Sequence, residues 1–470
     1  MRWTAIPMVV GGLALAGCGA QTRESSFSDV QKTISERTDQ RIHWNQGLTE
    51  DEETARAVHA MIASELTSDA AVQIALLNNR NLQATYEDLG IAQADLVRAG
   101  LLHNPMLSAT TKFHPGGGVK LEFSIVEDFL DVFFIPMRKR LAETTFEAAK
   151  LRVAGAVIDL ASETRVAFYR MQLATQTLEM RRTVVEATAL SSDLAARIHA
   201  AGNSTMSDLV QERVLYEQAK LDLAHAELQV VEEREHLNRL MGVWGPDTQW
   251  TANTRLPEIP SNEMDVTGLE KRAVERSLDL GITRTEIELG AQRLGIARPF
   301  GAISGADLGV AAEKELDGQW AFGPTVAVPL PMFNGGGPAV SAARAELRAS
   351  QDRYAAQAVD VRSLVRVARE RLLAARARAE YMRRVLIPLR QLAVEQLQLQ
   401  YNGMLASPFK LIQAKQQEIE AGGMYIESLG AYWVERANLQ RLLDGRMSAA
   451  DAQMPMMRGS MGAEPAERGH

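Results

Sequence analysis

The sequence is poor in cysteine, in aromatic residues and in long apolar runs. Cys18 is the one cysteine among 470 residues, so disulfides within the chain and thiolate metal clusters are excluded. No apolar run reaches the roughly 18 residues that a membrane-spanning helix needs. Aromatic residues make up 6% of the chain and the formal net charge is −8, which together argue against a nucleic-acid-binding protein.

Proline is missing from two long stretches, between Pro136 and Pro246 and between Pro338 and Pro388. Because proline breaks helix interiors, these gaps predict long helices separated by short non-helical segments. Phosphate-binding loops, nucleophile-elbow motifs and paired zinc-ligand motifs are absent from the sequence. We therefore predict no catalytic residue and no cofactor.

The N-terminus has the features of a signal peptide. Arg2 provides a basic start, residues 5–16 are apolar, and the run ends in Leu-Ala-Gly before Cys18. This ending resembles the bacterial lipobox, in which the cysteine sulfur receives a diacylglyceryl group. We expect a signal peptide over 1–17 and a lipidated segment over 18–65, held by several acyl chains. The alternative is a chance cysteine in an ordinary signal peptide.

The chain contains an internal repeat of domain size. Leu209-Val210-Gln211 recurs as Leu411-Ile412-Gln413, and Asn81-Leu82 recurs as Asp279-Leu280. In each half a helix precedes a glycine- and proline-rich β segment, which precedes a long helical region with one glycine break. The predicted organisation is repeat 1 over 66–245, a proline-rich linker over 246–264, repeat 2 over 265–443 and a methionine-rich flexible tail over 444–470.

Each half contains one predicted β-hairpin. In the first half, alternating residues 106–113 and 119–125 flank a glycine turn; in the second, residues 302–311 and 320–328 flank a polar loop that begins at Glu313. Four strands cannot close a barrel, and open strand edges are not tolerated in lipid. If these strands cross a membrane, several chains must share one barrel.

The long helices carry apolar stripes on two sides. Leu221 and Leu228 form one stripe, and a second, rotated by about 200°, contains Leu223 and Leu237. Two stripes fit a wall of helices and a soluble bundle equally well. Gly202 and Gly403 mark the breaks, where a left-handed helix stop and a restart predict the tip of an antiparallel hairpin.

The ordered set of these segments resembles the TolC-type outer-membrane efflux proteins. The resemblance rests on the lipobox, the two tips, and the segments 75–82, 100–105 and 329–336. It implies a mainly α fold with a small β part: long helical hairpins in a periplasmic α-barrel, and four strands per chain of a shared outer-membrane β-barrel. It further implies a homotrimer that serves as the outer-membrane exit duct of a tripartite pump, with a periplasmic adaptor and an inner-membrane transporter as partners.

The resemblance also assigns roles to the tips. It predicts that an adaptor docks there, on Gly202, Asn203, Ser204, Gly403, Met404, Leu405 and Ala406. It predicts a tunnel gate nearby, with Asp208, Tyr401 and Lys410 as candidates. The second tip lacks the acidic residue that the family often carries. Pro388 lies inside the last long helical region and should kink it.

The sequence does not name a substrate. His225 and His236 lie three helical turns apart, too far for one metal ion. Thioether ligands favour Cu(I), and the tail carries Met454, Met456 and Met457, but a flexible tail provides no fixed geometry. The exported substrate could be a drug, a metal ion such as copper or silver, or another solute. Alternative functions are a periplasmic adaptor lipoprotein, a structural envelope lipoprotein or an envelope-processing enzyme.

Overall fold

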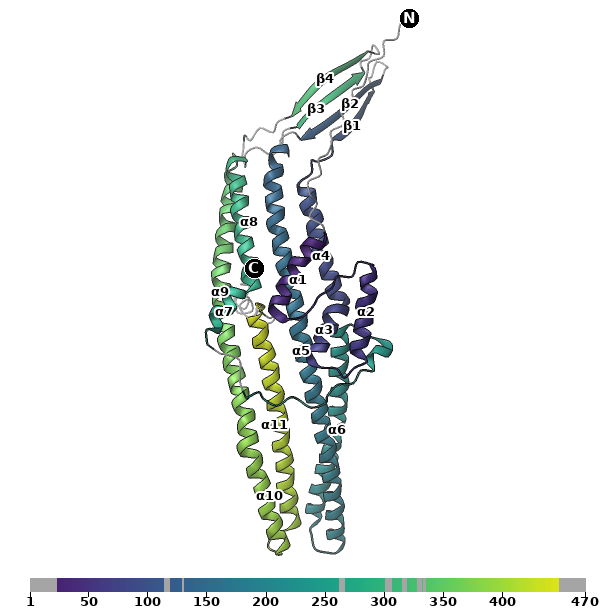
Figure 1. Ribbon diagram of the computed structural model, residues 1–470, viewed down its shortest axis with the longest axis vertical. Helices are drawn as coiled ribbons and strands as arrows, with labels where there is room; N and C mark the ends of the chain where they lie inside the picture. The colour runs from purple at the N-terminus through teal and green to yellow at the C-terminus, as the bar shows by residue number, and fades with distance from the viewer. Residues whose placement is uncertain are drawn as a thin grey trace, which may run out of the picture.

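The computed structural model describes residues 23–113, 119–128, 131–261, 267–300, 307–314, 319–327, 332 and 335–447. The predicted signal peptide, Cys18 and the tail methionines Met454, Met456 and Met457 lie outside these residues. Figure 1 shows an elongated chain, with a small sheet at one end, the tips of two helical hairpins at the other, and short helices around its middle.

The two predicted repeats have the same element order. Two helices, α1 (Arg23–Thr38) and α2 (Thr49–Ile62), precede the first repeat. Repeat 1 contains α3 (Ser68–Asn78), α4 (Arg80–Ala99), β1 (Met106–Phe113), β2 (Val119–Asp128), α5 (Asp131–Ala200) and α6 (Met206–Met241). After the short 3-10 helix η1 (Gly245–Thr248), repeat 2 contains α7 (Leu269–Arg276), α8 (Leu278–Phe300), β3 (Asp307–Lys314), β4 (Trp320–Ala327), α9 (Gly337–Tyr381), the π-helix η2 (Met382–Leu386), α10 (Ile387–Asn402) and α11 (Pro408–Leu443).

The first helical segment of each half is interrupted, where the sequence predicts one continuous helix. Asn79 and Ser277 each leave the helical conformation and cap the helix that follows. The Asn79 Oδ1 accepts from the Leu82 amide at 3.0 Å, and the Ser277 Oγ accepts from the Leu280 amide at 3.1 Å. Asparagine and serine are strong N-cap residues, which explains the break. Its presence at the same place in both halves agrees with the internal repeat.

The four strands form one antiparallel sheet in the order β1-β2-β3-β4. Strand β3 extends through Lys314 and pairs Glu313 with both Glu122 and Ala321. The prediction that Glu313 begins a loop was therefore wrong; ladder pairing on both sides of β3 keeps this residue in the sheet. Strands β1 and β4 are the two edges, and within the described residues each pairs on one side only.

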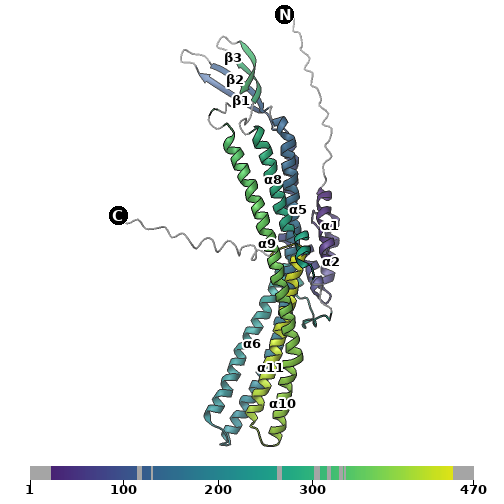
Figure 2. The same ribbon diagram turned by 90° about the vertical axis from the view of Figure 1, so that its left-hand side faces the viewer.

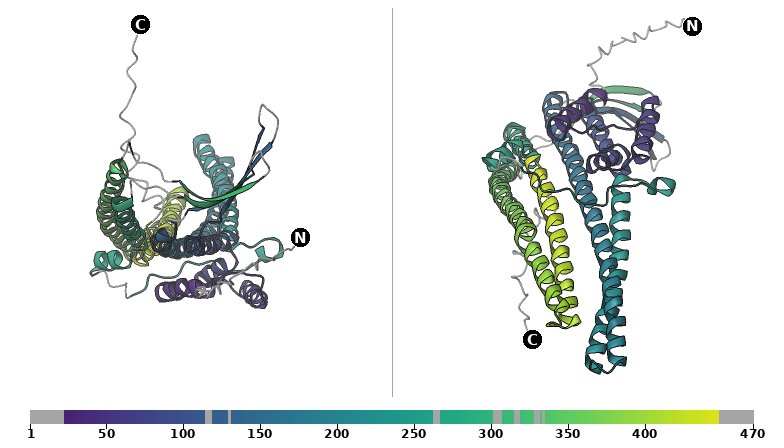
Figure 3. Two further views of the ribbon diagram at one scale, coloured as in Figure 1. Left: turned by 90° about the horizontal axis from the view of Figure 1, so that it is seen from above. Right: turned by 60° about the horizontal axis from the view of Figure 1, so that its bottom comes forward.

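The helices form one curved layer rather than a closed bundle, and Figures 1 and 2 show it from two sides. Near the sheet, neighbouring helices follow the order α9, α8, α5, α4; near the tips they follow the order α10, α11, α5, α6. Seen from above in Figure 3, the layer bends into an arc, with α1 and α2 on its convex side. The edge helices are α4 and α9 near the sheet, and α6 and α10 near the tips.

The linker between the repeats lies across the helices. The side chain of Gln172 on α5 donates to the carbonyl oxygens of Asn253 and Arg255, at 2.8 and 3.0 Å. On α11, the Trp433 indole donates to the Pro257 carbonyl at 2.8 Å. These bonds satisfy extended backbone that has no ladder partner of its own, so the linker ties the two repeats together.

The last long helical region bends where the sequence predicts a kink. The five-residue π-helix η2 immediately precedes α10, in which Pro388 occupies the first turn. A proline nitrogen cannot donate to the preceding turn, and a π-helical turn accommodates the missing bond. The prediction for Pro388 is confirmed.

The chain from Asp444 to Met447, predicted to belong to the flexible tail, packs into the middle of the molecule. Asp444 and Met447 are buried, and the Leu278 amide donates to the Gly445 carbonyl at 2.8 Å. The tail prediction was wrong for these four residues, because Arg446 pairs with carboxylates of both repeats.

Among the described residues, no helix is both long enough and apolar enough to cross a membrane.

Candidate functional site

The two faces of the sheet differ in chemistry. Alternate residues of the strands point to opposite faces, and the register places apolar side chains on one of them. That face carries Leu107, Phe113, Val119, Leu121, Phe123, Ile125, Val310, Phe322 and Val326. It also holds the neighbouring rings of Phe123, Trp320 and Phe322, whose consecutive centroids are 6.1 and 6.3 Å apart. Apolar side chains exposed in this number mark a surface that meets lipid or protein.

The opposite face of the sheet is polar. The hydroxyl groups of Ser108 and Ser124 lie 2.8 Å apart across β1 and β2. Nearer the ends of the strands, the Lys112 ammonium lies 2.9 Å from the Glu122 carboxylate, and Lys120 pairs with Glu313. A sheet with one apolar and one polar face can separate lipid from a water-filled channel.

The first hairpin tip, residues 198–208, is held by a backbone helix stop and by a side-chain cap. Gly202 has the left-handed φ of 77°, and the Asn203 amide donates to the Ile198 carbonyl at 3.1 Å, as in a Schellman stop. Asp208 and Thr205 then form a capping box at the start of α6. The Thr205 hydroxyl and amide donate to the Asp208 carboxylate, which lowers the pKa of Asp208.

The second tip, residues 400–410, has the same backbone but places its glycine differently. Gly403 has a φ of −81°, and the left-handed residue is Met404, with a φ of 62°. The prediction that Gly403 is a left-handed stop was wrong. The repeat shift of 202 residues aligns Gly202 with Met404, so the glycine of tip 2 lies one residue before the left-handed position. The Leu405 amide donates to the Gln400 carbonyl at 2.8 Å, which completes the same stop as in tip 1.

The proposed docking residues all lie at the tips, and most of them are exposed. Met404 and Leu405 are 94% and 82% exposed, and Ser204 and Ala406 are half-buried. The candidate gate residues are divided: Asp208 lies on tip 1, and Tyr401 and Lys410 lie on tip 2. Among the described residues of one chain, no hydrogen bond or ion pair joins these three side chains to one another. The capping box accounts for Asp208 without any gate function.

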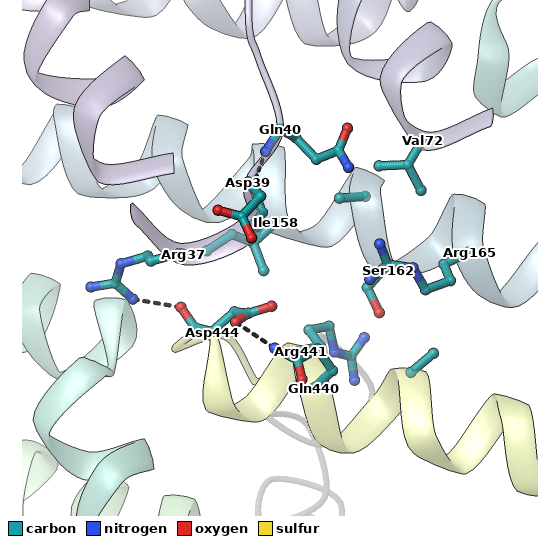
Figure 4. Close-up of a pocket in the computed structure, with 13 residues that line it drawn as sticks. Arg37, Asp39, Gln40, Val72, Ile158, Ser162, Arg165, Gln440, Arg441 and Asp444 are labelled. Atoms are coloured by element: carbon teal, nitrogen blue, oxygen red, sulfur yellow. Dashed lines mark hydrogen bonds between the residues drawn. The ribbon is translucent and has the colours of Figure 1, made fainter. Parts of the chain in front are cut away.

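A polar pocket lies at the middle of the molecule, where α1, α5 and α11 meet (Figure 4). It has a volume of about 150 Å³, and Arg37, Arg165, Arg441 and Asp444 are among its lining residues. Arg37 donates to the carbonyl oxygens of Arg276 and Asp444 at 2.6 and 2.5 Å. Burial raises the pKa of Asp444 to about 6, although Arg276, Arg165 and Arg37 oppose this shift.

Arg446 joins the two repeats beside this pocket. Its guanidinium donates to Asp159 on α5 at 2.7 Å and to Asp279 on α8. Burial raises the pKa of Asp159, while the hydrogen bond from Arg446 opposes the shift. Sequence analysis missed this cluster, since the three residues are far apart in the chain. The only signal was that Asp279 lies at a repeat-matched position.

The free edges of the helical layer carry exposed apolar side chains. On α6 these are Val210, Val214, Leu221, Leu228 and Val231, and on α10 they are Leu389, Leu392 and Leu399. Nearer the sheet, α4 exposes Ile91 and Val97, and α9 exposes Val359 and Val367. The first predicted stripe of α6 is therefore uncovered in a single chain, while Leu237 of the second stripe is buried.

No group of three or more potential metal ligands among histidine, cysteine, aspartate and glutamate occurs in the part of the chain that the structure describes.

The described chain is an arc of helices that carries a two-faced sheet at one end. Residues 137–243, which form the hairpin of α5 and α6, match the family model of the outer membrane efflux proteins. The cobalt-zinc-cadmium resistance protein CzcC of Cupriavidus metallidurans is 23% identical over 389 residues, with 81% of this chain and 90% of CzcC covered.

Solved structures agree with this fold. The outer membrane protein VceC of Vibrio cholerae is 18% identical, with a TM-score of 0.62 over 81% of this chain and 97% of VceC. The MtrE outer membrane channel of Neisseria gonorrhoeae is 15% identical, with a TM-score of 0.63 over 83% of this chain and 89% of MtrE. Residues 137–243 thus resemble the outer membrane efflux proteins in sequence, and most of the chain shares its fold with these two solved outer membrane proteins.

Proposed function

We propose that three copies of this chain close into one continuous exit duct of a tripartite efflux pump. The free edges of a single chain carry this proposal. The sheet ends in β1 and β4, and the helical layer ends in α4 and α9 near the sheet and in α6 and α10 near the tips. Pairing each edge with its opposite in the next copy covers the exposed apolar side chains. Three copies give twelve strands, within the range of known membrane barrels.

The orientation of the duct follows from the faces of the sheet. The apolar face and its aromatic side chains suit the lipid of the outer membrane, and the polar face suits the channel. The hairpin tips then lie at the periplasmic end. An adaptor that docks on Met404 and Leu405 would cover two of the most exposed apolar side chains of the described chain.

Lipid attachment at Cys18 would add a second anchor. Its support is the lipobox-like sequence alone, since this residue lies outside the described residues. Replacing Cys18 with Ser should abolish labelling by radioactive fatty acid, and equal labelling of the variant would contradict the anchor. Because strands rather than acyl chains would span the membrane, the trimer should still assemble.

The cargo we propose is a divalent metal cation. The support is the similarity to CzcC, whose name describes cobalt, zinc and cadmium resistance, over most of both chains. A strain that lacks the gene for this protein should then lose resistance to one or more of these cations. Unchanged resistance to all three, together with a changed resistance to organic drugs, would contradict this cargo.

Assembly and docking can be tested separately. Light scattering of the detergent-solubilised protein, corrected for detergent, should give the mass of three chains; a folded monomer would contradict the duct. Replacing Met404 and Leu405 with Glu should leave the trimer intact and abolish export, because charge would replace an apolar docking surface. Gly403→Ala is the matched control in the same turn and should preserve export, since Gly403 does not need a left-handed backbone. Loss of the trimer in the Met404 and Leu405 variant would make these residues structural.

A further inference from the structure

The polar face of the sheet has an unusual arrangement of charge near its hairpin end. Lys112 is directly opposite Lys120, and Glu122 is directly opposite Glu313. Like charges directly opposite each other destabilise an antiparallel pair. The side chains avoid this by pairing diagonally: Lys112 with Glu122 at 2.9 Å, and Lys120 with Glu313. We call these four residues the charge belt.

The charge belt lies on the channel side of the proposed barrel. Its members alternate with Leu121, Phe123 and Ala312, which point to the apolar face. Lys112 and Lys120 are one residue from the ends of β1 and β2, at the end of the sheet that lies away from the helices (Figure 1). Every solute that leaves through the barrel must therefore pass the belt near the outer end.

Without their lysines, Glu122 and Glu313 would form a pair of adjacent carboxylates. Directly opposite residues of an antiparallel pair have Cβ atoms about 5 Å apart, so two glutamates can share one ion. Carboxylate oxygens bind hard divalent cations and are also ligands of Zn²⁺, one of the cations in the name of CzcC. The two ammonium groups occupy these oxygens and bring the net charge of the belt from −2 to zero.

We propose that Lys112 and Lys120 mask Glu122 and Glu313 from the divalent cations that leave through the barrel, so that the exit does not retain its own cargo. This inference rests on the proposed function, since it assumes a metal-cation duct. Each lysine holds its carboxylate as a neutral pair. A passing cation then meets no uncompensated negative charge in the belt, and it leaves for the outside.

Metal binding to the purified full-length protein tests the masking. The probe is Mn²⁺, an oxygen-preferring cation whose free form is counted by electron paramagnetic resonance. Replacing Lys112 and Lys120 with Gln should add about one bound Mn²⁺ per chain, with an affinity about tenfold above that of the wild type. Further replacement of Glu122 and Glu313 with Gln should return binding to the wild-type level.

Lys314→Gln is the matched control. Lys314 lies next to Glu313 in β3, but it points to the apolar face, opposite Leu121 and Trp320. Its loss removes one positive charge beside Glu313 without uncovering a carboxylate, so Mn²⁺ binding should not change. If the variant without both lysines does not assemble, Lys112→Gln alone uncovers Glu122 and should give a smaller increase in binding.

Two results would overturn the masking. One is a variant without the two lysines that assembles and binds no more Mn²⁺ than the wild type. The other is a loss of Mn²⁺ from the wild type when only Glu122 and Glu313 are replaced, since the carboxylates would then bind metal with their lysines in place. Light scattering of each variant separates these results from a failure of the duct, because the wild type would then not have the mass of three chains.

Discussion

Tip 1 and tip 2 turn through equivalent backbone hydrogen bonds, but different residues close them. Tip 1 has glycine at its left-handed position and a capping box of Thr205 and Asp208. Tip 2 has Met404 at the left-handed position, and its N-cap residue Ser407 makes no side-chain capping bond. Both repeats therefore have the same turn geometry, but only tip 1 has the residues that favour it.

This difference suggests a division of roles between the tips. A left-handed methionine costs about 1 kcal/mol relative to glycine. In return, tip 2 presents Met404 and Leu405 as almost fully exposed apolar side chains. Strain and exposed apolar surface at one place are features of a binding surface. We therefore expect tip 2 to contribute more than tip 1 to docking.

The largest expected effect concerns the contact between the repeats around Arg446 and Asp444, which we call the joint. This contact holds the two hairpins in one layer. Arg446→Met should destabilise the chain by about 3 kcal/mol, because it leaves the carboxylates of Asp159 and Asp279 partly buried and unpaired. Thermal unfolding followed by circular dichroism measures the loss. Adding Asp159→Asn and Asp279→Asn should restore much of it, and failure to do so would mean that the arginine acts through packing.

A smaller effect at the same joint depends on pH. Burial raises the folded-state pKa of Asp444 to about 6, above its ordinary value of 3.8. The folded chain then binds a proton that the unfolded chain does not, so stability falls as pH rises through this window. Between about pH 5 and about pH 7.5 the loss should be about 1.5 kcal/mol.

The variant Asp444→Asn tests this assignment. It should remove that part of the pH dependence, in unfolding measured at both pH values. A variant whose stability falls between pH 5 and pH 7.5 as steeply as that of the native chain, or more steeply, would contradict it. Arg37, Arg165 and Arg276 face Asp444 from α1, α5 and α7, and their positive charges oppose the raised pKa of Asp444.

The left-handed positions should respond in opposite directions. Gly202→Ala should destabilise tip 1 by about 1 kcal/mol, and Met404→Gly should stabilise tip 2 by a similar amount. Hydrogen exchange of peptides that cover each tip measures both changes locally. Equal protection of the two tips in the wild type, or the same sign for both variants, would remove the distinction between them.

The smallest effect concerns the capping box. Thr205→Ala should weaken the start of α6 by roughly 0.5 to 1 kcal/mol, while Ser407→Ala should leave α11 nearly unchanged, because Ser407 makes no side-chain capping bond. Hydrogen exchange of the first turns of α6 and α11 compares the two. An equal loss of protection at both helices would show that Ser407 does cap α11 in solution.

Local patterns in the sequence predicted much of the fold. The proline gaps located the long helices, and alternation located the hairpins. The left-handed residue of tip 2 was missed because glycine is the usual residue there, and here the chain places methionine. The cluster of Asp159, Asp279 and Arg446 could not be predicted, since only tertiary packing brings these charges together.

Cross-linking between edge helices tests the central claim, that the edges of one chain close on the opposite edges of another. A photoreactive residue placed at Leu221, on the exposed stripe of α6, should cross-link to α10 of a second copy and give dimers and trimers on a denaturing gel. The same probe at the buried Ala226 should give cross-links within one chain. Cross-links from Leu221 that stay within one chain, or that reach no copy of this protein, would contradict the duct.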